Sequence, residues 1–338
     1  MKRVPWFELA GLAALALYPL LPGTEFARIG MEIRTILIFC ILALGLNVVV
    51  GYSGLLQLGI AAFFGIGAYI TGILTVDQFP FQTGIWIALA AATIGAGGAG
   101  FVLAAPTLRL RGDYLAIVTL GFGEVVKFSI KYMENITNGT RALDPLPVPG
   151  LLGRSFAWAE NYRGYYYLAF ALVVLVVILL RNLEKSRMGR AWIAIREDEL
   201  AASCMGINTV RVKLSAFALG AALAGLAGAL YATSLRTTGG PDSYTFNRSI
   251  TVLCFLIIGG MGNIRGALLG TFVLMGYDNI LTPRIDEWIQ KVGIAKFRFT
   301  DIKLIIFGLA LVLMMRFRPE GILPSKRVRE ELHEETGD

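Results

Sequence analysis

The stretch "ALGAALAGLAGALYA", residues 218–232, consists of alanine, glycine and leucine with a single tyrosine. It lies within a predominantly apolar run over residues 213–235, which is long enough to cross a bilayer, since a spanning helix needs about 20 residues. In lipid no hydrophobic drive holds helices together, so small residues that allow close backbone approach supply the contact. This run therefore predicts a membrane-spanning helix packed closely against its neighbours.

The rest of the chain has the same character. Of its 338 residues, 56% are hydrophobic and only 16% are charged, whereas about a quarter of a soluble domain is charged. Apolar spans occur at about 6–21, 33–50, 56–76, 84–105, 114–131, 164–181, 213–235, 249–261, 266–282 and 302–316. The sequence thus predicts an all-α polytopic membrane protein with about ten transmembrane helices. The eighth and ninth spans are short, so they are expected to be kinked or to form a hairpin that does not fully cross.

Basic residues predict the orientation. They gather at the N-terminus, in the turn "RLRGD" (109–113), in the connection 181–213 and in the tail after Arg316. With ten spans all four groups lie on one side, which the positive-inside rule assigns to the cytoplasm together with both termini. The Pro- and Gly-rich stretch 132–163 is then an outer loop, not a helix. The formal charge of +7 follows from these loops and does not indicate a nucleic-acid partner.

One apolar region is interrupted by polar residues. In "GLNVVVGYSGLLQLGIAAF", residues 45–63, polar side chains alternate with glycines. Broken helices of this kind line substrate paths in transporters, because freed backbone at membrane depth must be buried in protein or face a wet cavity. The alternative is a plain cytoplasmic turn at 51–54. The candidates for a translocation path are Asn47, Gly51, Ser53, Gly54 and Gln57. The later stretch "IIGGMGNIRGALLG" (257–270) is loosely similar, as in an internal repeat.

Glu124 is a further candidate for the translocation path. An ionisable residue within a membrane span is costly to bury, so it is a candidate functional residue by default. Lys127 follows three residues later. The alternative is therefore an ion pair between adjacent helical turns.

The sequence lacks the motifs of an enzyme. It contains no G-x-x-x-x-G-K-[ST] phosphate loop, its single histidine is His333 near the C-terminus, and its three cysteines have no metal-ligand spacing. Few charges lie within the spans, although ion-coupled carriers normally need them. We therefore expect no catalysis and no bound cofactor or metal, but a conduit energised by other subunits. A stand-alone carrier or channel is the alternative of another class.

A charged segment, "GRAWIAIREDELAASCMGI" (189–207), separates two apolar spans. Its pattern predicts two short helices broken near Asp198, with Ile193 and Leu200 packed under the bundle and Gly206 ending the second helix. Arg196 and Glu197 would then be exposed to a partner protein. The alternative is an ordinary solvated loop.

Five blocks resemble, in order along the chain, the M-type permease subunits of branched-chain amino acid ABC importers. They are "GLNVVVGYSGLLQLGIAAFFGIGAY", "LRLRGDYLAIVTLGFGEVVKF", the charged segment, "GGMGNIRGALLG" and "RPEGILP", which together span about residues 35–324. The resemblance implies a type II-like permease domain over 1–316 that contains a cytoplasmic coupling segment, 182–212. Residues 317–338 would form a cytoplasmic tail.

The resemblance also implies partners. Such a permease pairs with a related one in the bacterial inner membrane, two ATPase subunits bind on the cytoplasmic side, and a periplasmic binding protein delivers leucine, isoleucine or valine. ATP and Mg²⁺ would be bound by the ATPases, not by this chain. A related machine that carries urea or short amides is the alternative.

The family places its ATPase contact on the coupling segment. The residues implied here are Arg190, Trp192, Arg196, Glu197, Asp198, Glu199, Ala201, Ala202 and Gly206. Of the general importer pattern E-A-A-x-x-x-G, the sequence keeps Ala201, Ala202 and Gly206, while Leu200 occupies the Glu position.

Overall fold

A computed structural model describes residues 11, 15–20, 24–107, 113–147, 150–151, 154–155, 162–291, 305, 308–309, 312–314, 316–317 and 321–323. The predicted first and tenth spans, the "RLRGD" turn and the tail lie largely outside these residues.

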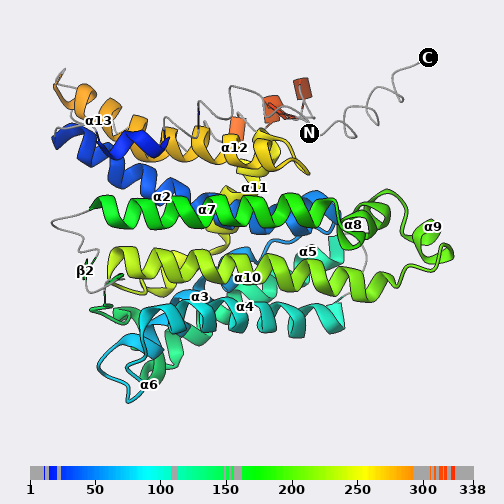
Figure 1. Ribbon diagram of the computed structural model, residues 1–338, viewed down its shortest axis with the longest axis horizontal. Coiled ribbons are helices and arrows are strands. Elements are labelled where there is room, and N and C mark those ends of the chain that lie inside the picture. Colours follow the sequence, from blue (N-terminus) through cyan, green and yellow to red (C-terminus); the bar gives the residue numbers. More distant parts are fainter. Residues whose placement is uncertain are drawn as a thin grey trace.

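The described chain is almost entirely helical (Figure 1). The long helices are α2 (Thr24–Leu46), α4 (Ile85–Thr107), α5 (Asp113–Tyr132), α7 (Tyr162–Glu184) and α10 (Thr209–Leu235). The shorter helices are α3 (Ile60–Thr75), α6 (Glu134–Thr137), α8 (Arg187–Glu197), α9 (Glu199–Cys204), α11 (Phe246–Gly259), α12 (Ile264–Gly276) and α13 (Thr282–Lys291). Single 3-10 turns form η1 (Tyr18–Leu20), η3 (Gly139–Arg141) and η4 (Pro241–Tyr244), and π-helical turns form η2 (Asn47–Tyr52) and η5 (Tyr277–Leu281). A minimal antiparallel hairpin joins β1 (Gly150–Leu151) to β2 (Arg154–Ser155).

Each apolar span predicted between residues 33 and 282 corresponds to a helix or a broken helix. Within the described residues, four helices are long and apolar enough to cross a membrane. A fifth candidate is the pair Pro241–Gly259 and Ile264–Asp286, which is bent by 120°. This bend confirms the expectation of a kink or hairpin in the eighth and ninth spans. The number of crossings stays a prediction.

Helix α10 lies at the centre of the bundle and packs against α4, α3 and α2. Its glycines face backbone of these neighbours, as the sequence predicted. A Cβ at Gly228 would lie 1.9 Å from the carbonyl oxygen of Phe64, and one at Gly225 would lie 2.8 Å from that of Ala92. Gly121 on α5 differs, because no described atom would lie within 4 Å of a Cβ there.

Helix α2 is the most deeply buried of the four candidate membrane spans among the described residues. In its apolar 18-residue stretch 89% of the residues are buried, whereas the corresponding share is 33% in α4 and 28% in α7. Helices α4 and α7 therefore present broad apolar faces outward. Phe39 is the centre of an aromatic cluster, with ring centroids 5.9 Å from Phe64 and 6.0 Å from Tyr231. The guanidinium of Arg248 lies 5.2 Å from the Phe39 ring centroid, so its charge is placed over an aromatic face.

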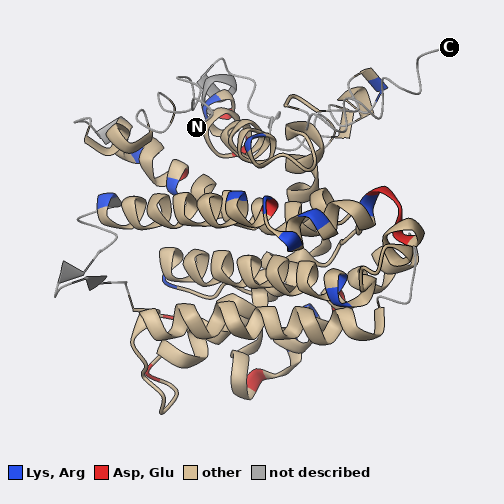
Figure 2. Ribbon diagram, turned by 45° about the vertical axis from the view of Figure 1, so that its right-hand side comes forward, with Lys and Arg blue, Asp and Glu red and all other residues tan. Residues whose placement is uncertain are grey.

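The connections gather at two opposite ends of the bundle. On the right of Figure 1, α8 and α9 project beyond the long helices. At the other end the stretch 142–146 pairs with 236–238, since Leu146 N donates to Arg236 O at 2.9 Å and Thr238 N to Leu143 O at 3.0 Å. Charged residues lie mainly toward helix ends and in the α8–α9 connection (Figure 2). The outer-loop prediction was wrong in one detail, because this loop contains the short helix α6.

Candidate coupling and translocation site

The charged segment forms two helices, as predicted. Helix α8 ends at Glu197, and Asp198 adopts an extended conformation with its carboxylate accepting from Leu200 N at 2.8 Å and Ala201 N at 3.0 Å. This is an N-cap that begins α9, because the cap satisfies two of the amides that a helix start leaves unpaired. Gly206 follows α9 with φ of +83°, a conformation that glycine adopts without strain. Asp198 and Gly206 therefore delimit the second helix.

The buried face of this segment differs from the prediction. Leu200 is 73% exposed, so the expectation that it packs under the bundle was wrong. Trp192, Ile195 and Ala202 are buried instead. Trp192 and Ile195 are three residues apart and lie on one face of α8, which is the face turned toward the bundle.

Trp192 fastens α8 to α10. Its indole Nε1–H lies 3.0 Å from both Val212 O and Ser215 Oγ, at the first turns of α10. Only 1% of the residue is exposed. A buried indole with its donor satisfied is a stable anchor, because it combines a large apolar surface with a directed polar contact.

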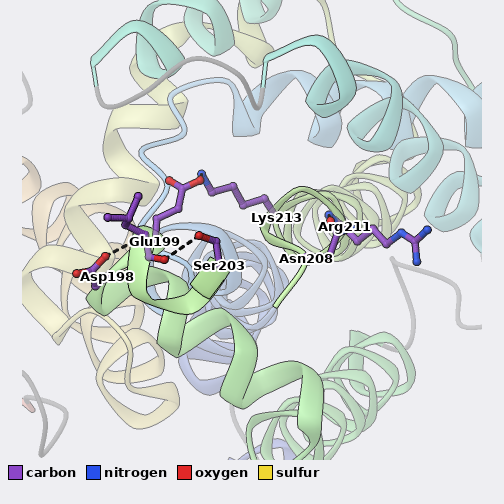
Figure 3. Close-up of polar contacts among 7 residues, drawn as sticks. Asp198, Glu199, Ser203, Asn208, Arg211 and Lys213 are labelled. Carbon is purple, nitrogen blue, oxygen red and sulfur yellow. Dashed lines mark hydrogen bonds and ion pairs between the residues drawn. The ribbon is translucent and has the colours of Figure 1, made fainter. Parts of the chain in front are cut away.

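An ion pair fastens α9 to the same helix. Glu199 Oε1 lies 2.6 Å from Lys213 Nζ, and Figure 3 shows the two side chains meeting between α9 and the start of α10. The Lys213 side chain is 6% exposed and that of Glu199 is 40% exposed. Asn208 begins α10 by accepting from Arg211 N at 3.0 Å (Figure 3). Glu199 is thus engaged within the chain.

The nine predicted coupling residues differ in how far their side chains are exposed. Arg190, Glu197, Asp198, Ala201 and Gly206 are exposed, Trp192 and Ala202 are buried, and Arg196 and Glu199 are half-buried. The exposed residues form the outer face of α8 and α9. They are the part of the segment that another protein could contact directly.

The predicted helix break is present, and it lies on the side of α8 that faces the bundle. The π-helical turn η2 continues α2, and residues 54–59 are not helical before α3 begins at Ile60. Neighbouring helices satisfy the freed backbone: Leu58 N donates to Thr119 Oγ1 at 3.0 Å and Ala61 N to Ser249 Oγ at 3.1 Å. Irregular backbone is therefore tolerated here because it is enclosed by α5 and α11.

Polar side chains of the break are buried. Ser53 Oγ donates to Val49 O at 2.7 Å, and Asn47 Oδ1 accepts from Gly262 N at 2.9 Å. Gln57 is 1% exposed, and within the described residues neither atom of its amide has a hydrogen-bond partner. An unsatisfied buried amide costs free energy, and Asn47 Nδ2 of the same group also has no hydrogen-bond partner among the described residues.

The two similar glycine-containing stretches, 45–63 and 257–270, meet in space at Arg196. The Nη1 atom of Arg196 donates to Gly51 O, and a Cβ at Gly51 would lie 2.6 Å from Gly262 N. The turn around Gly260 also contacts the described residues 321–323, because Ile322 N donates to Ile258 O at 2.9 Å and Leu323 N to Gly259 O at 3.0 Å. The expectation that Arg196 faces outward was wrong, because its guanidinium points into the bundle.

Glu124 lies on α5, where its Oε2 atom is 3.7 Å from Lys127 Nζ. This is the ion pair that the spacing of the two residues offered as the alternative. Both side chains are partly exposed, so the pair stabilises the helix by only a few tenths of a kcal/mol.

Three contacts of this region were not predicted from the sequence. Thr119 and Ser249 cap the freed amides of the break, and Lys213 pairs with Glu199. Single serines and threonines occur throughout the spans and carry no signal of their own. Lys213, a cation at the edge of an apolar span, was the one visible clue. Among the described residues, no group of three or more His, Cys, Asp or Glu side chains could hold a metal ion.

Residues 29–315 match the family model described as branched-chain amino acid transport system, permease component. The high-affinity branched-chain amino acid transport system permease protein LivM of Salmonella typhimurium is 36% identical over 327 residues, which cover 90% of this chain and 72% of the relative. LivM of Escherichia coli K12 is 37% identical over 323 residues, 89% of this chain and 72% of the relative.

A second type of permease is also similar. LivH of Escherichia coli K12 is 24% identical over 309 residues, which cover 86% of this chain and 93% of the relative. No solved structure matches the chain.

Proposed function

Because the chain belongs to the family of permease components of branched-chain amino acid transport systems, we propose that it forms half of the translocation path of an ATP-driven importer for leucine, isoleucine or valine. It acts in the bacterial inner membrane beside a second, related permease. The similarity to both LivM and LivH supports a paired arrangement of two such subunits. The chain itself is a transport subunit and performs no hydrolysis.

The observation that carries this proposal is the anchored helix pair α8–α9. It projects from one end of an otherwise apolar bundle (Figure 1), and Trp192 and Glu199 tie it to α10. A docking surface that transmits force must be exposed on one face and rigidly attached on the other. We assign the exposed face, with Arg190, Glu197 and Asp198, to the contact with the ATPase subunits, which bind ATP and Mg²⁺ on the cytoplasmic side.

The helix break supports the placement of the path. It combines irregular backbone with the buried amide of Gln57, which has no hydrogen-bond partner in the part of the chain that the structure describes. Substrate sites of transporters lie at such discontinuous helices, since freed polar groups there replace the water shell of the solute. We assign Asn47, Gly51, Ser53, Gly54 and Gln57 to the path. Glu124 is a weaker candidate because Lys127 engages it.

Reconstitution tests the proposal. The chain, its paired permease, two ATPases and the periplasmic binding protein are placed in proteoliposomes, and uptake of labelled leucine, isoleucine and valine is measured with and without ATP. We expect uptake that requires ATP and the binding protein. ATP-driven uptake of urea or short amides instead would select the alternative cargo, and uptake by the chain alone would refute the importer proposal.

A charge reversal tests the docking surface. Glu197 is exposed at the end of α8, so Glu197→Lys is expected to reduce uptake and transport-linked ATP hydrolysis by about tenfold, in the usual range of coupling energies. Glu197→Asp keeps the charge and serves as the control. Unchanged uptake and hydrolysis in the lysine variant would contradict the assignment.

A further inference from the structure

Arg196 lies where three segments that are distant in sequence converge. Its backbone belongs to the last turn of α8, its Nη1 atom donates to Gly51 O at the end of η2, and the same atom lies against the turn at Gly262. Gly262 N in turn donates to Asn47 Oδ1 at 2.9 Å. The coupling segment, the broken helix and the α11–α12 turn are thus joined through one guanidinium and one amide.

The chemistry of this junction suits an arginine. Gly51 lies in the last turn of the continuous helix formed by α2 and η2, where carbonyl groups lack an intrahelical partner and carry partial negative charge. A guanidinium supplies both the donor and the positive charge that such a helix end needs. Arg196 therefore caps a helix that is 145 residues away in sequence.

Two glycines enclose the arginine side chain. A Cβ at Gly54 would lie 2.9 Å from Arg196 Cγ, and a Cβ at Gly262 would lie 2.9 Å from Arg196 Nη1. Both glycines also have positive φ, +68° and +77° respectively, so another residue would be strained there. The slot therefore holds Arg196 closely on two sides, against the backbone at Gly54 and at Gly262.

We infer that Arg196 is a positioning residue that transmits movement of α8 to the helix break at 47–54 and to the turn at 260–263, and is not itself a contact for another subunit. The inference rests on the proposed function and deepens it. Trp192 holds the middle of α8 to α10, so a push on the outer face of α8 rotates the end of the helix that carries Arg196. Because the slot is tight, that rotation displaces the break and the turn together.

The test uses the reconstituted importer with Arg196→Ala, Arg196→Lys and, as the matched control, Arg265→Ala, which removes an exposed arginine beside the same turn. A cysteine reporter at Leu56, an exposed residue of the non-helical stretch 54–59 that follows the break, is introduced in a Cys204→Ser background. Four quantities are measured: retention of the ATPases in the purified complex, ATP hydrolysis, uptake, and the change in maleimide labelling of Leu56→Cys upon ATP addition.

For Arg196→Ala we expect retained ATPases and continued hydrolysis, uptake reduced about tenfold or more, and loss of the ATP-dependent labelling change. Arg196→Lys should keep part of the uptake and part of the labelling change, since one donor and the charge remain. Arg265→Ala should behave as the parent. Gly262→Ala, whose Cβ would lie 2.9 Å from Arg196 Nη1, approaches the slot from its other side and should reproduce the Arg196→Ala result, which provides a second route if that variant does not assemble.

Loss of the ATPases from the Arg196→Ala complex would overturn the inference in favour of an outward docking role. Normal uptake with a normal labelling change in that variant would also overturn it, while the proposed function would stand. Absence of ATP-driven uptake in the parent complex would refute the proposed function, and the inference with it.

Discussion

At the scale of single residues, the coupling segment separates anchoring from recognition. Trp192 and Glu199 face α10, Arg196 faces the helix break, and Glu197 and Asp198 face outward. The charged tetrad at 196–199 therefore contains residues with different roles, although the sequence presents them as one run. Composition predicts a charged surface, whereas the direction in which each side chain points is decided by its position around the helix axis.

The anchoring role of Trp192 can be tested by removing its donor. Trp192→Phe keeps most of the buried apolar surface but leaves Val212 O and Ser215 Oγ without the indole N–H. We expect a loss of about 1 kcal/mol in stability, the usual net contribution of one hydrogen bond, because Ser215 Oγ still donates to Val212 O in the variant. The midpoint of thermal unfolding of the solubilised protein measures this loss.

Trp86→Phe is the control for that measurement, because Trp86 is 43% exposed on α4. Its midpoint should move much less. Equal shifts in the two variants would show that the indole of Trp192 does not stabilise α8 on the bundle.

At the scale of helices, glycine and alanine determine how closely α10 approaches its neighbours. Gly228 meets the backbone of α3, Gly225 that of α4 and Gly220 that of α2, where a Cβ would lie 2.8 Å from Gly45 O. At these positions α10 comes close to the backbone of three helices, with the side chains of Ala96 and Val49 packed beside Gly225 and Gly220. This close approach replaces the hydrophobic drive that is missing between helices in lipid.

Gly228→Ala tests this packing. Its Cβ would lie 1.9 Å from Phe64 O, which is backbone and cannot move aside cheaply. We expect a loss of about 1–3 kcal/mol, as for other overpacked interiors, measured as a lower denaturant midpoint or a lower yield of folded protein.

The matched substitution Gly98→Ala has open space around its Cβ on the exposed face of α4. It should be neutral or slightly stabilising, because alanine favours a helix over glycine by about 1 kcal/mol. A comparable loss in both variants would contradict the role given to close backbone contact.

At the scale of the whole molecule, the connections sort to two ends. The break at 47–54, the helices α8 and α9 and the turn at 260–263 share one end, where Arg196 joins them. The stretches 142–146 and 236–238 share the other end. The proposed function requires the first end to lie in the cytoplasm.

Cysteine labelling tests that orientation. The native thiol of Cys204 is exposed on α9, and Thr140→Cys, in a Cys204→Ser background, places a thiol at an exposed position of η3 near the opposite end. An impermeant maleimide should label Thr140→Cys on intact spheroplasts but should label Cys204 only after the membrane is opened. The reverse pattern would invert the proposed topology.

The sequence alone was sufficient for the features that depend on local chemistry. Apolar runs of adequate length predicted the helices, the polar interruption at 45–63 predicted the break, and Asp198 and Gly206 predicted where the second coupling helix begins and ends. These features depend on hydrophobic length, capping and backbone freedom, which neighbouring residues carry with them.

Only the tertiary structure decided which faces meet. Leu200 is apolar and exposed, while Arg196 is charged and turned inward toward Gly51. A helical pattern shows which residues share a face, but it does not show which distant segment that face contacts. The stretches 45–63 and 257–270 meet because the bundle brings them to one place, where Gly262 N donates to Asn47 Oδ1 and Arg196 supplies a positive charge to the helix end at Gly51.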